Sequence, residues 1–257
     1  MQIAEYIPTE QLRPYIKAYK IIESRYDTTN KVLPTTSFAM SFRFKGQISY
    51  LNDSNKTALH FANLAGLQKS TRLINYDNDT SAIIVIFKET GLSAFFRQPL
   101  HELFGQSISL DNFFSTSETL ILQEHLTNCK SNVERIAVLE QFLLSKLIHC
   151  STDKLILAAI GKINAGNGHV RIKELAKAFF ISQDAFEKRF RKTTGATPKQ
   201  FSHIVKMNKA IAQHKSVTSF LDMAFENGYY DQPHFNKDFK IFTGQTPTDF
   251  FRSTSYW

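Results

Sequence analysis

The chain has 257 residues and a formal net charge of +8, which is long enough for one large or two ordinary domains with real cores. Residues 1–150 hold 15 Lys and Arg against 14 Asp and Glu, whereas residues 151–257 hold 16 against 9. A positive charge concentrated in one half is the electrostatic footprint of a protein that binds a polyanion. A merely soluble basic surface is the alternative, and the charge by itself does not separate the two.

Several classes of protein are excluded by composition. The two cysteines, Cys129 and Cys150, are too few for a disulfide framework and lack metal-ligand spacing, so a reduced cytosolic pair is expected. A redox sensor at Cys129 is the alternative. No apolar run approaches the roughly 18 residues of a membrane span, and residues 1–10 show no signal peptide. The sequence therefore predicts a cytoplasmic protein with no membrane partner.

The first 90 residues show the periodicity of strands. Residues 12–22 fit either a short helix or an opening strand. Phe38, Met40, Phe42 and Phe44 alternate with smaller or polar residues, which is a strand pattern. Lys45-Gly46 reads as a hairpin turn. Further strands are expected at 47–51, 60–64, 71–76 and 82–87, with loops at 53–56 and 77–79, and these five or six strands predict a small antiparallel barrel or sandwich.

Beyond Thr90-Gly91 the pattern becomes helical. Helical segments are expected at 92–97, 99–104, 117–127 and 133–149, with a short connection at 110–114. Residues 150–153 form a polar break that serves as a domain boundary and caps a helix at 154–165. The sequence thus predicts an α+β protein, with a β-rich sensor or dimerisation domain and trailing helices over residues 1–150 and an all-α domain over residues 151–257.

The second half contains one stretch twice, at residues 175–201 and 223–250. Each copy has an alanine, two phenylalanines four residues apart, a glycine, a proline and another phenylalanine. From the first phenylalanine onward the paired positions are 49 residues apart, and such internal repetition means one structural unit used twice. The paired residues are Ala176, Phe186, Phe190, Gly195, Pro198 and Phe201 in the first copy, and Ala224, Phe235, Phe239, Gly244, Pro247 and Phe250 in the second.

Each copy reads as a short helix, a tight turn and a second helix. In the first copy the first helix is expected at 172–179, and Ser182 is the N-cap of the second. In the second copy the first helix is expected at 218–226, Gly228 supplies the turn and Asp231 the cap. The phenylalanines share one face of each second helix because they are four residues apart, and the opposite face is polar and basic. This is the helix-turn-helix arrangement.

The second half resembles the DNA-binding domain of the AraC/XylS family of transcription regulators. The resemblance covers roughly residues 153–252 and is highly specific, because it needs two motifs, their linker and both Gly-x-x-Pro ends. It implies a seven-helix domain that inserts two recognition helices into adjacent major-groove segments of promoter DNA. The residues that carry it are the run 228–240, Gly244-Gln245-Thr246-Pro247, Phe250-Phe251-Arg252, and Lys206, Met207, Ala210 and Ile211 of the linking helix.

Three positions depart from the family's usual pattern. Phe180 stands where the first turn usually has Gly, so a bulky residue is expected at positive φ, a strained conformation. Pro233 stands where Ser is common, and Lys237 where Arg is common. The departure at Phe180 leaves open whether the first motif reads bases.

The resemblance assigns DNA binding to the outward faces of the two second helices. Gln and Asn pair with adenine, Lys with guanine, and Glu accepts a hydrogen bond from cytosine. Arg191, Lys192 and Lys240 are expected to neutralise phosphates. Solvated helix faces are the alternative. The predicted DNA-binding residues are Ser182, Asp184, Glu187, Lys188, Arg191, Lys192, Gln232, Pro233, Asn236, Lys237 and Lys240.

Two further expectations concern the rings of the repeat. The four inward phenylalanines of the second helices are expected to form the core, and stacking on unpaired bases is the alternative. His234 is expected to be structural or to face a phosphate rather than to bind a metal.

The front half resembles, more weakly, the N-terminal modules of some AraC-type regulators. In the family such modules bind a small effector, dimerise, or both. A small-molecule effector, a homodimer through the helix near 133–148, and RNA polymerase are therefore the further partners expected besides double-stranded promoter DNA. The residues that carry this resemblance are Val32-Leu33-Pro34, Gly66-Leu67-Gln68, residues 84–87 and Thr90-Gly91. A barrel of this kind would be cupin-like.

No catalytic site, cofactor or metal is predicted. His60, His101, His125 and His149 are scattered, and neither a metal-ligand spacing, a phosphate loop nor a nucleophile elbow occurs. The competing hypothesis is a ligand-binding or hydrolytic β-domain whose helical tail is only a scaffold or interaction module. A regulator without an effector, controlled by its own abundance, is the third.

Overall fold

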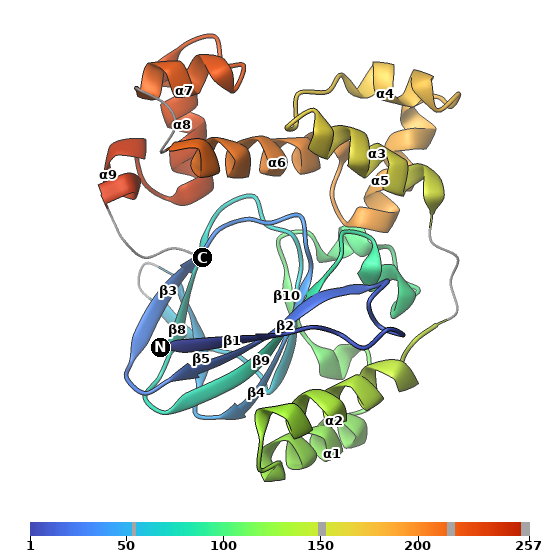
Figure 1. The fold of residues 1–257 in the computed structure, drawn as a ribbon, viewed down its shortest axis with the longest axis vertical. Coiled ribbons are helices and arrows are strands. Elements are labelled where there is room, and N and C mark those ends of the chain that lie inside the picture. The colour runs from blue at the N-terminus through green and yellow to red at the C-terminus, as the bar shows by residue number, and fades with distance from the viewer. Residues whose placement is uncertain (53–54, 149–152, 215–218, 253–257) are drawn as a thin grey trace.

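The computed structural model describes residues 1–52, 55–148, 153–214 and 219–252. The predicted features at His149, Cys150 and residues 150–152, and the expected helix start at residue 218, lie outside these ranges. A β domain with trailing helices is followed by a helical domain that lies across one end of it (Figure 1). The predicted α+β class is confirmed. Among the helices described, none combines the length and apolar character needed to cross a membrane.

Ten strands of the described residues build two antiparallel sheets. The larger sheet has the order β1-β2-β9-β4-β7-β10 and the smaller one β3-β8-β5-β6. The strands are β1 (Gln2–Tyr6), β2 (Ile16–Ser24), β3 (Thr28–Val32), β4 (Ala39–Lys45), β5 (Ile48–Asn52), β6 (Asn55–Ala58), β7 (Ala62–Ala65), β8 (Arg72–Tyr76), β9 (Thr80–Phe87) and β10 (Ser107–Ser109).

The six-stranded sheet is covered on both faces, which explains the unbroken apolar run at its centre. In β9, Ile84 and Ile86 face a cavity between the two sheets. Ile83 and Val85 point the other way, fully buried in the cluster that includes helix side chains. A strand with both faces covered needs apolar residues throughout.

Two helices, α1 (Thr116–Asn128) and α2 (Asn132–Ser145), cover the outer face of that sheet (Figure 1). Their buried residues include Leu122, Leu126, Leu139 and Leu143. Phe142 packs edge-to-face on Phe42 of β4, with ring centroids 6.5 Å apart. Both helices were predicted, although α2 ends four residues before the expected residue 149.

The structure decides one element of the front half that the sequence left open and corrects two others. Residues 16–24 form a strand, because β2 pairs with β1 on one side and with β9 on the other. The expected helical segments at 92–97 and 99–104 are single 3₁₀ turns, η1 (Gly91–Ala94) and η2 (Leu100–Leu103), and a third, η3 (Leu110–Asn112), lies in the expected connection. Four strands, β1, β3, β6 and β10, were not predicted. Each is an edge strand of its sheet.

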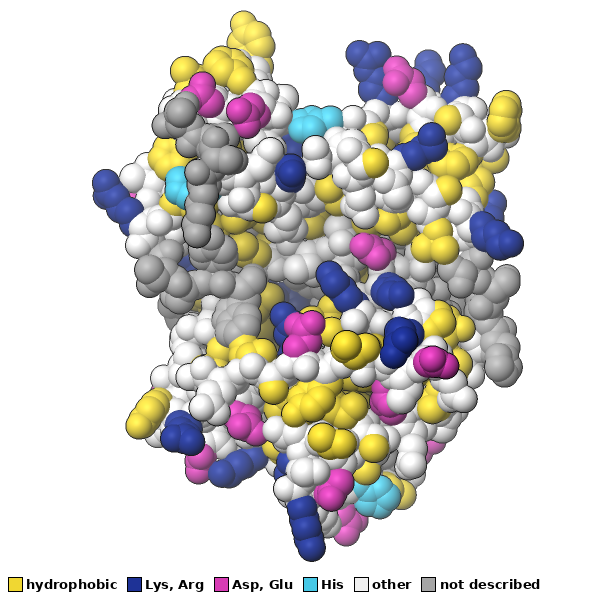
Figure 2. Space-filling view, viewed as in Figure 1, with side chains coloured by type: hydrophobic (Ala, Val, Ile, Leu, Met, Phe, Trp, Pro, Cys, Tyr) yellow, Lys and Arg dark blue, Asp and Glu magenta, His cyan; other side chains and the backbone are white. Residues whose placement is uncertain are grey.

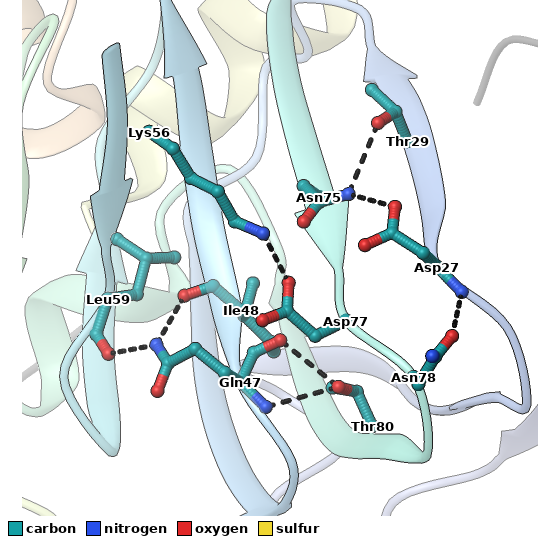
Figure 3. A network of polar contacts seen from close by, with 10 residues as sticks. All are labelled: Asp27, Thr29, Gln47, Ile48, Lys56, Leu59, Asn75, Asp77, Asn78 and Thr80. Carbon is teal, nitrogen blue, oxygen red and sulfur yellow. Dashed lines mark hydrogen bonds and ion pairs between the residues drawn. The ribbon is translucent and has the colours of Figure 1, made fainter.

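One end of the β domain is closed by a polar network that ties three turns together (Figure 3). Asn75 Nδ2 donates to Asp27 Oδ1 at 2.8 Å, and Asp27 N donates to Asn78 Oδ1 at 2.6 Å. Thr80 Oγ1 accepts from Gln47 N at 3.1 Å and donates to Gln47 O at 3.0 Å. The opposite end of the two sheets faces the helical domain (Figure 1).

Seven helices of the described residues form the second domain, as expected. They are α3 (Lys154–Ala165), α4 (Ile172–Ala178), α5 (Gln183–Thr194), α6 (Pro198–Gln213), α7 (Phe220–Glu226), α8 (Gln232–Thr243) and α9 (Pro247–Arg252). The repeated phenylalanines of both copies are fully buried. They form the core, so they are not available for stacking on unpaired bases.

Candidate nucleic-acid interface

Helices α5 and α8 are matched in length and in both of their ends. Ser182 Oγ accepts from Ala185 N at 3.2 Å, and Asp231 Oδ1 accepts from His234 N at 2.8 Å. Both helices span 12 residues and end at a left-handed glycine, Gly195 or Gly244, each with a φ of 77°. The duplicated sequence thus produces duplicated geometry, and both predicted caps are confirmed.

The two helices lie at opposite ends of α6, which joins the two motifs (Figure 1). Their C-terminal ends rest on the β domain. The Thr71 amide donates to Phe242 O of α8 at 3.0 Å, and a methyl group at Gly195 would lie 2.3 Å from Phe38 Cζ. Their N-terminal turns, where major-groove readers place base-contacting side chains, therefore point away from the β domain.

On α5 most of the predicted DNA-binding residues are exposed, namely Ser182, Asp184, Lys188, Arg191 and Lys192. Glu187 is half-buried and accepts a 2.7 Å hydrogen bond from Gln183 Nε2. That bond orients both side chains near the N-terminal end of the helix, so Gln183 joins the candidate surface. Sequence reasoning missed it, although Gln and Glu four residues apart are neighbours on a helix.

On α8 the exposed predicted residues are Pro233, Lys237 and Lys240. Gln232 and Asn236 are half-buried. The Oδ1 atom of Asn236 is buried and has no hydrogen-bond partner within the described ranges. Of the predicted α8 set, Lys237 is thus the exposed cation nearest the helix N-terminus.

A second basic surface lies on α4. In Figure 2, Lys and Arg side chains gather along the edge of the helical domain where α4 lies. Arg171, Lys173 and Lys177 are exposed there. The first helix of a helix-turn-helix motif crosses the DNA backbone, so these cations suit phosphate contacts. The sequence signal was Lys173 and Lys177 four residues apart, which places them on one helix face.

The turn before α5 is strained, as the sequence predicted. Phe180 has a φ of 56°, and 96% of its surface is exposed. A left-handed backbone at a bulky residue is unfavourable, and no burial of this ring offsets it. The corresponding turn of the second copy uses Gly228, with a φ of 66°.

A polar cluster beneath α8 holds that helix on α6. Asp238 accepts from Tyr229 Oη at 2.6 Å and lies 2.9 Å from His203 Nε2. The hydrogen bond from His203, and that from Tyr229, lower the pKa of Asp238 to about 2 despite its partial burial. Lys206 Nζ lies 3.5 Å from the centre of the Tyr229 ring, and burial lowers the pKa of Lys206.

Two further histidines border this cluster. His234 packs edge-to-face on Tyr229, with ring centroids 5.2 Å apart. His169, from the loop before α4, lies against Gly228, where a methyl group would be 2.9 Å from its Cε1 atom. Burial, and then the charge of Lys206, lower the pKa of His169. The turn of the second motif is thus packed on a loop of the first.

The β domain contains a cavity of about 450 Å³ between its two sheets. Its walls are mainly aliphatic and aromatic, with Ile22, Ile74, Ile84 and Ile86 among them. Three cationic side chains, Lys17, Lys20 and Arg72, line it together with one acid, Glu89. Sequence reasoning placed Ile84 and Ile86 in a buried strand but did not predict the cavity, because strand alternation shows which residues share a face but not which face meets a void.

Arg72 is held in place within this wall. Its guanidinium lies 5.0 Å from the centre of the Tyr50 ring. One nitrogen donates to Tyr50 Oη at 3.2 Å and another to Gly105 O at 2.7 Å. Asn208 of α6 also lines the cavity, so its boundary includes the helical domain. Among the described residues, no group of three or more His, Cys, Asp or Glu side chains is placed to hold a metal ion.

Two family models match the chain. Residues 175–253 match a model described as a helix-turn-helix domain, and residues 4–109 match one described as a domain of unknown function (DUF6597). The first match spans both helix pairs described above. None of the curated proteins matches the chain.

Similar solved structures include ToxT from Vibrio cholerae, at 9% identity and a TM-score of 0.47, covering 91% of this chain and 97% of ToxT. The C-terminal domain of AraT, a response regulator from Geobacillus stearothermophilus, has 17% identity and a TM-score of 0.38, with coverages of 42% and 92%. The xylose-binding transcription activator XylR has 22% identity and a TM-score of 0.37, with coverages of 48% and 38%.

Proposed function

We propose that this chain, a DNA-binding transcription regulator with an AraC-type helix-turn-helix domain over residues 175–253, reads promoter DNA through α5 and α8. The observation that carries the proposal is the matched pair of capped helices with exposed polar N-terminal turns. Both turns face away from the β domain, so one chain presents two readers to a duplex. The two halves, residues 1–150 and 151–257, act as sensor and reader.

Two roles are assigned within the DNA-binding surface. Exposed cations along the helices neutralise phosphates and set affinity, whereas side chains in the first two turns contact base edges and set sequence preference. The phosphate group consists of Arg171, Lys173, Lys177, Arg191, Lys192 and Lys240. The base-reading group consists of Ser182, Gln183, Asp184, Glu187, Lys188, Gln232, Pro233, Asn236 and Lys237.

The cavity between the sheets is the effector site of this proposal. Its volume is within the range of small-molecule pockets. A largely apolar wall with Lys17, Lys20 and Arg72 against Glu89 favours an apolar molecule that carries an acidic group, because the wall has an excess of positive charge. Dimerisation through the trailing helices, contact with RNA polymerase, a cytoplasmic location and the absence of enzymatic activity complete the proposal.

The test begins with selection of duplexes from a random-core DNA pool by the intact protein. Binding of the selected duplex should weaken steeply with salt, by about 10³-fold or more between 50 and 200 mM if six or more phosphates are contacted. Lys237→Ala should weaken binding by about 1–3 kcal/mol and relax base preference at one position.

A matched control distinguishes the loss of a base-reading side chain from the loss of a positive charge elsewhere on the protein. Lys45 is exposed at the far end of the β domain and pairs with Asp79 at 3.1 Å. Lys45→Ala removes the same charge without touching the reading surface, and it should leave base preference unchanged. If Lys237→Ala keeps the full preference of the wild type, the assigned reader is rejected. If the intact protein enriches no duplex, the proposed function is rejected.

A further inference from the structure

One short segment of the β domain contacts the linking helix α6 and the C-terminal ends of both reading helices, α5 and α8. Residues 31–38, here called the coupling segment, run from the end of β3 to the start of β4. Lys31 Nζ donates to Gln245 Oε1, just beyond the end of α8. Pro34 O accepts from Asn208 Nδ2 of α6 at 2.9 Å. Phe38 lies against Gly195 at the end of α5.

Neighbouring residues of the β domain add contacts to the segment and to the ends of the two reading helices. Thr71 Oγ1 donates to Val32 O at 2.9 Å, while the amide of Thr71 donates to Phe242 O of α8 at 3.0 Å. At the end of α5, Leu100 O would be 3.0 Å from a methyl group at Gly195. The C-terminal ends of both reading helices thus rest on one connected patch of the β domain.

The same segment is a wall of the cavity. Every residue from Val32 to Phe38 lines the cavity, and so does Asn208. A molecule in the cavity would contact this segment directly, together with Asn208, whose side chain bonds the segment to α6. Protein interiors are close-packed and transmit displacements, whereas side chains that line a void lack partner atoms on one side. Some atoms of the segment pack on the helical domain and others line the cavity, so a molecule bound there would add packing partners to the segment.

We propose that the coupling segment transmits occupancy of the cavity to both reading helices and so sets their relative placement on DNA. This inference rests on the proposed function, because it assumes that α5 and α8 bind DNA. A ligand shifts such an equilibrium only by its differential affinity for the two arrangements, and coupling between two sites is typically about 5- to 150-fold in affinity.

The test needs no identified ligand, because a substitution can fill the cavity. Ala65 lines the cavity from β7, and Ala65→Leu adds three carbon atoms there. Ala137 is exposed on α2, so Ala137→Leu is the matched control. Dissociation constants are measured for the duplex selected by the wild-type protein. Ala65→Leu should change the dissociation constant by about 5-fold or more, and Ala137→Leu by less than about 2-fold.

A double-mutant cycle then tests the route. Asn208→Ala removes the hydrogen bond to Pro34 O without altering either reading helix. If the coupling passes through this hydrogen bond, the change in dissociation constant caused by Ala65→Leu should be smaller by about 3-fold or more when Asn208 is replaced. The reason is that the effects of coupled sites are not additive. If Ala65→Leu behaves like Ala137→Leu, or if its effect is the same with and without Asn208, the proposal is overturned.

Two further outcomes are distinguished. If Ala65→Leu does not fold, as judged by circular dichroism, Ala39→Val fills the same cavity with less added volume and decides the same question. If the wild-type protein selects no duplex, the proposed function fails. A wild-type protein that binds DNA without any response to cavity filling contradicts only the coupling.

Discussion

At the scale of single residues, Asp238 shows how one carboxylate holds a reading helix. It sits on the inner side of α8, next in sequence to the exposed Lys237, and binds Tyr229 and His203. The carboxylate therefore holds α8 on the linking helix α6, with the opposite face of α8 turned outward. Because its side chain is only 27% exposed, loss of its hydrogen bonds should cost more than loss of a surface pair.

Asp238→Asn should lower the free energy of unfolding by about 1–3 kcal/mol at pH 7. The pKa of Asp238 is lowered from an ordinary value of 3.8 to about 2 in the folded protein. The stabilisation is thus fully present above pH 4 and is lost as the pH falls toward 2. The difference between wild type and variant should shrink over that range. Urea unfolding, from pH 7 down to the lowest pH at which both proteins fold, measures it.

The control for this prediction is Glu174→Gln. Glu174 forms an exposed ion pair with Arg171 in the same domain, at 3.0 Å, and such pairs contribute about 0–1 kcal/mol. A loss for Asp238→Asn no larger than that of the control, or a loss that stays constant to the lowest pH, would contradict the assigned role of the carboxylate.

At the scale of elements, the strands that escaped sequence prediction have one cause in common. β1, β3, β6 and β10 are the edges of the two sheets. All four residues of β6 are exposed, and β3 reads Thr-Thr-Asn-Lys-Val. An edge strand is defined by backbone hydrogen bonds to one neighbour, and its side chains need not alternate between core and water. The central strands, buried by their neighbours, carried the periodicity that predicted them.

The helical domain was predicted almost completely because its signals are local. Ser182 and Asp231 cap their helices through their own side chains, and Gly195 and Gly244 end them. The cavity was not predicted, because Ala65 of β7 and Ile74 of β8 belong to different sheets that meet only in the folded chain. The cluster around Asp238 escaped for the same reason, since His203 is 35 residues away in sequence.

The turn glycines give an element-scale prediction about how tightly the two domains pack. Gly105, Gly195 and Gly244 have φ values of 77–78°, so replacement by Ala costs about 1 kcal/mol in backbone strain at each. A methyl group at Gly105 meets no atom within 4 Å, at Gly244 it meets Thr71 Cγ2 at 3.2 Å, and at Gly195 it meets Phe38 Cζ at 2.3 Å.

The destabilisation should therefore rise in the order Gly105→Ala, Gly244→Ala, Gly195→Ala. The last variant should lose about 1–3 kcal/mol beyond the first, because overpacking forces Phe38 or the α5 end to move. Chemical denaturation of the three variants measures the order. Equal losses at Gly105 and Gly195 would mean that the β domain does not pack on the end of α5.

At the scale of the whole molecule, the β domain is a platform beneath both readers. It contacts α8 through Thr71, Gln245 just beyond α8 through Lys31, α6 through Pro34, and the end of α5 through Phe38. Successive major-groove segments on one face of DNA are about 34 Å apart. A single chain with two readers held on one platform should thus bind two segments within one site, whatever its oligomeric state.

The two motifs should read separate halves of that site. Alanine substitution of one exposed lysine from each motif tests this. Lys188 is exposed on α5 and Lys237 on α8. Lys188→Ala should relax base preference in one half only and Lys237→Ala in the other, because each lysine reaches one groove segment. Their effects on binding free energy should add to within about 0.5 kcal/mol, as expected for distant sites without shared partners.

Selection from random DNA with each variant, and a footprint of the wild type, measure this. A loss of preference in the same half for both variants, or protection of a single groove segment, would mean that Phe180 and its strained turn leave the first motif out of base reading.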